Sequence, residues 1–254
     1  MKVVILAGGF GTRLSEYTES IPKPMVTVGG KPILWHIMNS YAKAGFNEFI
    51  LALGFKADSI KQYFSSLKLM DSDATIDFAE SAIVHHEDAG CDWKVTMVDT
   101  GLESMTGGRL GRLRQFLCDQ PFMLTYGDGL SDVPLKELVR FHQEHQKKAT
   151  ITAVRPVARF GELKLEGTKV TSFREKPQVT QSWINGGFFI FQPEVLNLIS
   201  GDETVLEKEP LEELAKEGEL MAYKHEGFWQ CMDTKRDRDF LEELWVSGEA
   251  AWTI

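Results

Sequence analysis

Four features of this chain combine side chains suited to binding phosphate and a divalent ion. A glycine-rich segment at residues 8–14 has the sequence GGFGTRL, and Lys23 follows it between two prolines. Asp128 lies between two glycines, and Asp233 immediately precedes a threonine. Glycines let backbone amides approach a phosphate, cationic side chains bind its oxygens, and Mg²⁺ prefers oxygen ligands such as carboxylates. These residue types predict a polyphosphate site that includes a metal ion.

Each feature also has an ordinary structural explanation. The glycine-rich segment can be a tight turn after a strand, and Lys23 can be a solvated loop residue. Asp128 can be a turn-forming aspartate between its glycines. Asp233 and Thr234 can simply cap the last helix. These alternatives stay open at the level of single residues.

The order of elements around these residues predicts an α/β fold. The continuous apolar run from Val3 to Ala7 is typical of a strand buried on both faces. Helically spaced apolar residues follow over 31–45, then a second apolar strand at 48–53 and a helix over 57–67. This alternation favours right-handed crossovers and a parallel sheet. Further strands are expected at 73–79, 94–98, 121–126 and 150–154, with helices near 110–117 and 135–139.

The pattern changes after about residue 156. A hairpin is expected around Gly167, with an aromatic-rich strand at 183–191 after it. We therefore expect one domain over 1–254, with a Rossmann-like mixed, mostly parallel sheet flanked by helices and a β-rich elaboration in the second half. The remaining elements are expected as helices at 193–200 and 210–217, a strand at 220–224 and a final helix at 234–247.

The glycine-rich segment follows the first strand directly, at the edge where open α/β sheets bind ligands. A dinucleotide-binding fold is a competing interpretation, because Gly9 and Gly11 match two of the three glycines in its fingerprint. The third position is Leu14, however, and the second strand ends in residues 53–55 without an acidic side chain to hold a ribose hydroxyl. The next helix also begins only after Pro32. A dehydrogenase is therefore disfavoured.

The composition limits the partners. A net charge of −9 argues against broad binding to nucleic acid or to an anionic membrane, so phosphate charge must be neutralised locally. The three cysteines are widely spaced without a CxxC pattern, which predicts reduced thiols and no structural zinc site. No apolar run approaches the roughly 20 residues of a membrane span, and the first strand is too short for a signal peptide. We expect a cytoplasmic protein with no nucleic-acid or membrane partner.

Residues 8–14, followed by Pro22-Lys23-Pro24, resemble the long and specific signature of the sugar-1-phosphate nucleotidyltransferases. The resemblance implies that the glycine-rich segment binds the base and phosphates of a nucleotide and that Lys23 contacts its triphosphate. The catalytic residues that it implies are Arg13, Lys23 and Asp128. The implied nucleotide-binding residues are Leu6, Ala7, Gly8, Gly9, Gly11, Thr12, Arg13, Lys23, Ser104, Thr106, Arg109 and Gly127.

The resemblance covers the whole chain and narrows to the members of this family that use CTP and glucose 1-phosphate. It rests on the segments 33–38, 104–110, 125–129 and 228–234. Two positions depart from the expected pattern. Phe10 stands where leucine is expected, and Cys231 stands where proline is expected.

The same resemblance divides the chain into a nucleotide-binding half, 1–156, and a sugar-phosphate-binding half, 157–254. It assigns Asp128 and Asp233, one from each half, to a shared Mg²⁺. The implied sugar-phosphate ligands are Gly161, Glu175, Lys176, Asn185 and Gly186.

Structural alternatives to these roles are also open. Glu175 and Lys176 can form a surface ion pair, and the glycines after Asn185 can mark a bulge. Thr106 can cap a helix beside a solvated Arg109.

These residues favour an in-line displacement, in which a phosphate oxygen of the sugar phosphate attacks the α-phosphorus of the triphosphate and pyrophosphate leaves. The resemblance implies that the two reactants are glucose 1-phosphate and CTP. The nucleophile is already anionic, so the reaction needs no strong base. The resemblance implies CDP-glucose as the product, for dideoxysugar synthesis, and a homo-oligomer, with a hexamer suggested. Two alternatives are a uridylyl- or thymidylyltransferase on a hexose 1-phosphate and a catalytically silent nucleotide-sugar sensor.

Overall fold

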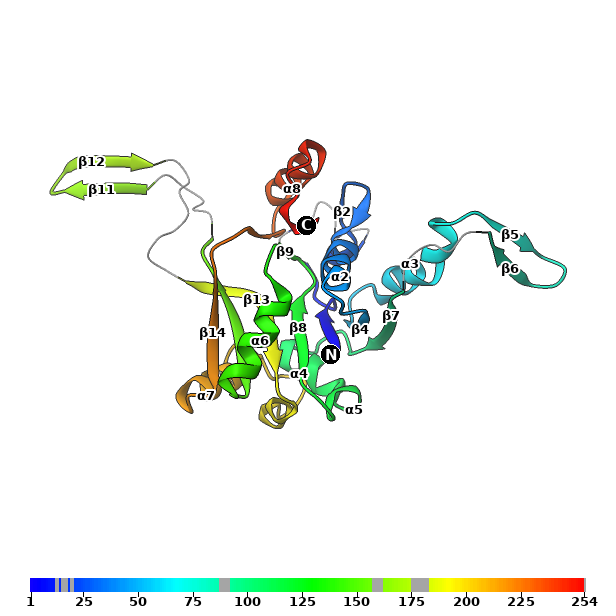
Figure 1. The fold of residues 1–254 in the computed structure, drawn as a ribbon, viewed down its shortest axis with the longest axis horizontal. Helices are drawn as coiled ribbons and strands as arrows, with labels where there is room; N and C mark the ends of the chain where they lie inside the picture. The colour runs from blue at the N-terminus through cyan, green and yellow to red at the C-terminus, as the bar shows by residue number, and fades with distance from the viewer. Residues whose placement is uncertain are drawn as a thin grey trace.

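A seven-stranded sheet forms the centre of the molecule (Figure 1). The computed structural model describes residues 1–11, 14, 18, 21–86, 92–156, 162–174 and 183–253. The strands lie in the order β14-β10-β13-β8-β1-β4-β7. Their bounds are β1 Val3–Leu6, β4 Glu48–Leu53, β7 Lys94–Asp99, β8 Phe122–Tyr126, β10 Ala149–Val154, β13 Ile184–Phe191 and β14 Leu220–His225.

Strand β13 gives the sheet its mixed character. It runs antiparallel to both of its neighbours, β10 and β8. The other neighbouring strands of the sheet pair in parallel. The carboxyl ends of the parallel strands and the beginning of β13 therefore meet at one edge. This topology confirms the expected mixed, mostly parallel sheet flanked by helices.

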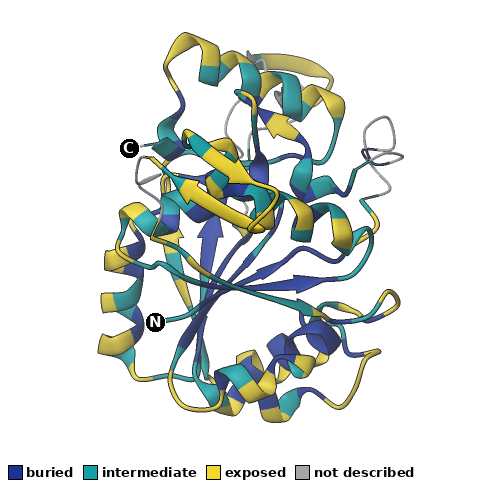
Figure 2. Cartoon of the chain, turned by 90° about the vertical axis from the view of Figure 1, so that its right-hand side faces the viewer, coloured by how far each residue is buried: buried dark blue, intermediate teal, exposed yellow. Residues whose placement is uncertain are grey.

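Helices cover both faces of the sheet, which explains why its inner strands are largely apolar. Side chains alternate along β1: Val3 and Ile5 belong to one hydrophobic core, and Val4 and Leu6 to the other. Figure 2 shows the buried strands between helices whose outer faces are exposed. The first core includes residues of α2 Ile33–Lys43, α3 Ala57–Met70, α6 Leu135–His145 and α8 Lys235–Ser247. The second includes residues of α4 Thr106–Arg112, α5 Arg114–Leu117, the 3₁₀-helix η3 Pro193–Leu198 and α7 Glu209–Lys216.

Short strands and turns complete the chain. Strand β9 pairs with β15, and this pair brings the segment before α8 next to the segment after β8. The hairpins β5–β6 and β11–β12 extend from the body at opposite ends of the view in Figure 1. These elements are β2 Thr27–Val28, β3 Lys31–Pro32, β5 Ala74–Asp77, β6 Ala82–His85, β9 Gly129–Ser131, β11 Glu162–Glu166, β12 Lys169–Arg174, β15 Trp229–Cys231, η2 Lys23–Met25 and η4 Ala251–Thr253.

The sequence was wrong about two local elements. The helix expected over 31–45 begins at Ile33, because Lys31 and Pro32 form β3, which pairs with β2. The helix expected at 193–200 is the 3₁₀-helix η3. The strand expected at 73–79 is present as β5, but its partner β6, with which it forms an exposed hairpin outside the central sheet, was not predicted.

Two sequence expectations, that no segment spans a membrane and that the cysteines are reduced, can be compared with the described residues. Within the described part of the chain, no helix has both the length and the apolar character that crossing a bilayer requires. Cys118 and Cys231 are free thiols, and Cys91 lies outside the described residues.

Candidate active site

A cavity of about 1300 Å³ opens at the edge of the sheet where the parallel strands end. Every predicted site residue that the structure describes lines this cavity. They come from the end of β1 and the loop after it, from the loop after β8, from the starts of η2 and β13, from the beginning of α4 and from the segment before α8. These residues are Leu6, Ala7, Gly8, Gly9, Gly11, Lys23, Ser104, Thr106, Arg109, Gly127, Asp128, Asn185, Gly186 and Asp233.

Five predicted site residues lie outside the described residues. Their predicted roles in binding nucleotide or sugar phosphate stay predictions. They are Thr12, Arg13, Gly161, Glu175 and Lys176.

Close packing explains the first glycine after β1. A Cβ on Gly8 would collide with the guanidinium of Arg109, whereas a Cβ on Gly9 would meet no atom within 4 Å. Gly11 has a φ of +65°, in the left-handed region that favours glycine. The loop therefore needs glycine at two positions for its own conformation and packing, in addition to any role in ligand binding.

Arg109 is buried, with only 5% of its surface exposed, so the alternative of a solvated arginine is wrong. Its Nη1 donates hydrogen bonds to Leu53 O, Thr100 Oγ1 and Gly101 O, and its Nη2 donates to Leu102 O. Burial lowers the pKa of Arg109. This guanidinium ties the loop after β7 to the end of β4, and it also lines the cavity beside Gly8.

Lys23 lies between the two aspartates that the sequence singled out. Its Nζ is 2.6 Å from Asp128 Oδ2 and 2.7 Å from Asp233 Oδ1. Its side chain is 12% exposed, so it is not the solvated lysine that a loop position alone would suggest. Burial opposes its charge, but the attraction of Asp128 and the hydrogen bonds to both carboxylates outweigh burial and raise the pKa of Lys23. The structure therefore brings together a cation and two carboxylates far apart in the sequence.

The local folding of the Asp233 segment leaves its carboxylate available to the cavity. Thr234, not Asp233, is the N-cap of α8, and it forms a capping box with Asp237. The Thr234 hydroxyl accepts from Asp237 N, and the Asp237 carboxylate accepts from Thr234 N in return. The cap thus holds Asp233 one residue before the N-cap of α8, beside the β9–β15 pair.

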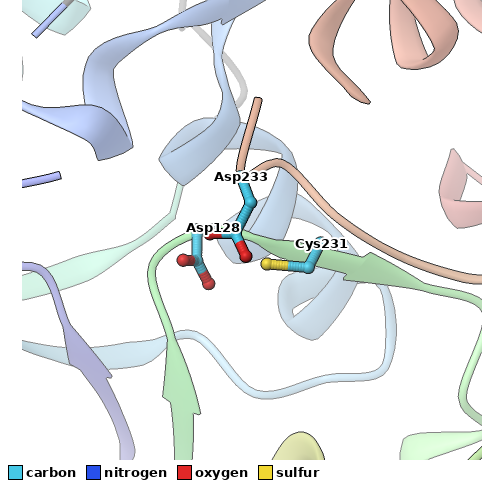
Figure 3. Close-up of side chains that lie close together, drawn as sticks. All are labelled: Asp128, Cys231 and Asp233. Carbon is cyan, nitrogen blue, oxygen red and sulfur yellow. The ribbon is translucent and has the colours of Figure 1, made fainter. Parts of the chain in front are cut away.

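A metal ion could bind to a cluster formed by Asp128, Asp233 and Cys231. One ligand atom from each lies within 4.8 Å of the others, and Figure 3 shows the three side chains grouped together. Burial and the nearby charge of Asp128 raise the pKa of Cys231, so its sulfur is a neutral thiol. The two carboxylates suit Mg²⁺, which prefers oxygen ligands, and the thiol does not. The residues present therefore fit a Mg²⁺ held by two aspartates together with ligand oxygens.

Three hydroxyl and carboxyl side chains connect the two sides of the cavity, and sequence reasoning did not assign two of them, Tyr126 and Glu207. Met105, not Thr106, is the N-cap of α4. The Thr106 hydroxyl instead donates a hydrogen bond to the Glu207 carboxylate. The Tyr126 hydroxyl also donates to Glu207 and accepts from the side-chain amide of Asn185. Tyr126 adjoins the Gly127-Asp128 motif and could have been noticed there. Glu207 carries no sequence signal, because it lies in a polar connection between η3 and α7.

Backbone contacts shape the side of the cavity that the start of β13 forms. Trp229 donates its indole N–H to Gly186 O at 2.7 Å, and a Cβ on Gly186 would collide with Val154. Gly187, with a φ of +80°, lies against the ring of Tyr126. The glycines after Asn185 thus allow close packing around β13, and the register of β13 with β10 is irregular nearby, as the bulge alternative anticipated.

The fold and the site define an α/β protein with a ligand cavity at the carboxyl edge of its sheet, a glycine-rich loop, and a lysine held by two aspartates. The family model described as nucleotidyl transferase matches residues 2–243. The chain belongs to this nucleotidyl transferase family.

Comparison with known proteins agrees with this assignment. The chain is 52% identical to a glucose-1-phosphate cytidylyltransferase of Salmonella typhi over 253 residues, which cover 99% of this chain and 98% of that protein. It is 35% identical to the mannose-1-phosphate guanylyltransferase catalytic subunit beta of Xenopus tropicalis, over 95% of this chain and 63% of that protein. Among solved structures, HddC from Yersinia pseudotuberculosis superposes with a TM-score of 0.71 at 25% identity, over 96% of this chain and 99% of that one.

Proposed function

We propose that this protein transfers a cytidylyl group from CTP to α-D-glucose 1-phosphate, forming CDP-glucose and pyrophosphate. A phosphate oxygen of the sugar phosphate forms a bond to the α-phosphorus of CTP. The bond from that phosphorus to the bridging oxygen of the β-phosphate breaks, and the electron pair leaves with pyrophosphate. No proton transfer is needed, because the attacking oxygen is already anionic near neutral pH.

The observation that carries the chemistry is the Lys23–Asp128–Asp233 cluster on a glycine-lined cavity. The choice of CTP and glucose 1-phosphate is supported by the 52% identity to the Salmonella typhi enzyme over nearly the whole chain. The 35% identical relative is named for GTP chemistry on mannose 1-phosphate, so base and sugar differ within the family while the fold persists.

Each side of the cavity has a distinct part in this proposal. Gly8, Gly9 and Gly11 present backbone to the triphosphate, and Lys23 neutralises its charge as pyrophosphate departs. Asn185 and Gly186 face the sugar phosphate from the start of β13. Thr12 and Arg13 are proposed to assist on the nucleotide side, and Gly161, Glu175 and Lys176 on the sugar-phosphate side.

Asp128 and Asp233 would hold Mg²⁺. When bound, the ion neutralises phosphate charge and favours substitution at phosphorus. The carboxylates of this chain keep the ion and Lys23 on the same side of the cavity. Alignment of two bound reactants supplies roughly 7–11 kcal/mol of a barrier of this kind, so positioning is the larger part of what the protein does.

The composition and the family resemblance also support proposals about the compartment, the oligomeric state and the partners of this protein. We propose a cytoplasmic enzyme that works as a homo-oligomer, with small-molecule substrates and no nucleic-acid or membrane partner. The net charge of −9 supports the absence of polyanionic partners.

Pyrophosphate release tests the proposal. The purified chain is incubated with Mg²⁺, glucose 1-phosphate and, in separate reactions, CTP, UTP, dTTP or GTP. We expect release with CTP at a kcat/KM at least about tenfold above the other triphosphates. A preference for UTP or dTTP would replace the proposed nucleotide. Calorimetric binding of CTP without any pyrophosphate release would instead indicate a nucleotide-sugar sensor.

A further inference from the structure

One carboxylate behind the cavity receives hydrogen bonds from both of its sides. Glu207 lies in the connection between η3 and α7 and is not itself part of the cavity wall. Its Oε2 accepts from Thr106 Oγ1 at 2.6 Å, and its Oε1 accepts from the Tyr126 hydroxyl at 2.5 Å. Thr106 and Tyr126 both line the cavity. Glu207 thus links two wall residues that no strand pairing connects.

The network continues from each hydroxyl into a different element. Thr106, the first residue of α4, accepts from Leu206 N at 2.9 Å. Tyr126, the last residue of β8, accepts from Asn185 Nδ2 at 3.2 Å, and Asn185 Oδ1 accepts from Gly187 N at 2.8 Å. Through Glu207, the start of α4 is therefore connected to the start of β13.

The direction of every hydrogen bond in this network is determined. A carboxylate only accepts, and a backbone N–H only donates. At one end, the N–H of Gly187 requires Asn185 to turn Oδ1 toward it, so Nδ2 must face Tyr126. At the other end, Glu207 requires Tyr126 to donate to it. All the bonds point toward Glu207. Among the described residues, Asn185 Nδ2 donates only to Tyr126, so its second hydrogen can serve an acceptor oxygen of a ligand.

The energetics favour a role beyond packing. An extra anion close to a phosphate-binding cavity repels the ligand, so a carboxylate here is costly unless it serves another purpose. The Tyr126 and Thr106 hydroxyls both lie within hydrogen-bond distance of a carboxylate oxygen of Glu207, and each can satisfy that oxygen only by donating its proton. Hydrogen bonds to a charged acceptor are stronger than those to a neutral one, so the two hydroxyls are held firmly.

We propose that Glu207 is a positioning residue that fixes Thr106 on the nucleotide side and Asn185 on the sugar-phosphate side in one geometry. Asn185 then presents an N–H donor to a hydroxyl or phosphate oxygen of the sugar phosphate. The assignment of the two sides to nucleotide and sugar phosphate rests on the proposed function, whereas the network that joins them does not.

Kinetics of four variants of the full chain test this role: Glu207→Gln, Thr106→Val, Tyr126→Phe and, as a matched control, Glu203→Gln. Glutamine can accept at only one of the two oxygen positions, so Glu207→Gln should raise the KM of both CTP and glucose 1-phosphate about tenfold. Thr106→Val should raise mainly the KM of CTP, and Tyr126→Phe mainly that of glucose 1-phosphate. Glu203 is exposed in the same segment, and its neutralisation should leave both KM values unchanged.

The outcomes separate this inference from the proposed function. A lower unfolding temperature of Glu207→Gln with unchanged KM values would show a purely structural role and overturn the inference. If Glu207→Gln does not fold, unchanged KM values in both Thr106→Val and Tyr126→Phe overturn it equally. If the wild type prefers another triphosphate, the proposed function fails, and the same variants are compared with that substrate. Calorimetric affinities of the wild type and Glu207→Gln give a readout that does not require turnover.

Discussion

At the scale of single residues, the site is organised by one cation between two anions. The ammonium of Lys23 lies within 2.7 Å of a carboxylate oxygen of both Asp128 and Asp233. These are the same carboxylates that would hold Mg²⁺. Lys23 therefore compensates their charge in the free protein, and if a metal ion bound these carboxylates, Lys23 would be released to bind a phosphate ligand.

Removal of that ammonium should change metal binding even without substrate. In Lys23→Met the two carboxylates lose their internal cation, so we expect Mn²⁺, used as a probe for Mg²⁺, to bind at least about tenfold more tightly in the absence of nucleotide. Electron paramagnetic resonance of free Mn²⁺ measures this affinity. Lys31→Met removes a lysine from a more exposed pair with Asp71 and serves as the control. Equal affinities in wild type and Lys23→Met would contradict the idea that Lys23 competes with the metal.

The carboxylate of Asp128 should matter for turnover more than for folding. Asp128→Asn keeps the shape of the side chain but removes its charge, and we expect kcat to fall at least about a hundredfold. The rate of pyrophosphate release measures the loss, and circular dichroism shows whether the variant folds. The exposed Asp73→Asn controls for the change of charge. Activity close to that of the wild type at limiting Mg²⁺ would remove Asp128 from the mechanism.

At the scale of elements, the loops at the carboxyl edge hold one another in place. Arg109 of α4 donates to backbone oxygens at the end of β4 and in the loop after β7, and its guanidinium leaves no room for a side chain at Gly8. The glycine-rich loop after β1 and the beginning of α4 are therefore packed as a unit.

Two neighbouring glycines give a matched test of this packing. Gly8→Ala would place a Cβ against Arg109, so we expect a loss of about 1–3 kcal/mol in the free energy of unfolding. Gly9→Ala meets no atom within 4 Å and should change that free energy by less than about 0.5 kcal/mol. Urea unfolding curves of the two variants give the comparison. Equal destabilisation by both substitutions would show that the clash with Arg109 does not limit this loop.

At the scale of the whole molecule, a buried histidine far from the cavity links stability to pH. Burial, assisted by the neighbouring His145, lowers the pKa of His142 to about 4 from its ordinary value of 6.5. The ring is fully buried, lies 2.8 Å from Thr150 Oγ1, and accepts from the side-chain amide of Gln192 at 3.1 Å. A protonated ring could not accept that hydrogen bond, so the fold keeps His142 neutral.

This depressed pKa predicts a loss of stability in acid. Below about pH 6.5 the unfolded chain binds a proton on this ring that the folded chain does not, so stability falls as the pH decreases from 6.5 toward 4. The contribution of His142 should be at most about 3 kcal/mol, because each unit of pKa shift corresponds to about 1.4 kcal/mol. Urea midpoints at several pH values measure it, with His142→Gln as the comparison. The same pH slope in both proteins would exclude His142 as the source.

Much of the fold could be predicted because burial leaves periodic traces in sequence. Strand β1 is apolar throughout and β4 is apolar from Phe49 onward, since helices cover both of their faces, and α2 repeats its apolar residues at helical spacing. Strand β6 of the β5–β6 hairpin was not predicted, for the opposite reason. Its residues are largely exposed, so no buried face imposes a pattern on them.

By itself the sequence determined the types of group in the site: glycines after the first strand, Lys23 between prolines, and Asp128 and Asp233 at turns. Local motifs carry this information because each is contiguous in the chain. Only the tertiary structure decided which groups meet. Lys23 reaches Asp128 and Asp233 across separations of 105 and 210 residues, Arg109 is buried under Gly8, and Glu207 joins two hydroxyls from distant elements. Such partners are set by strand order and helix packing, which a single sequence does not record at any one position.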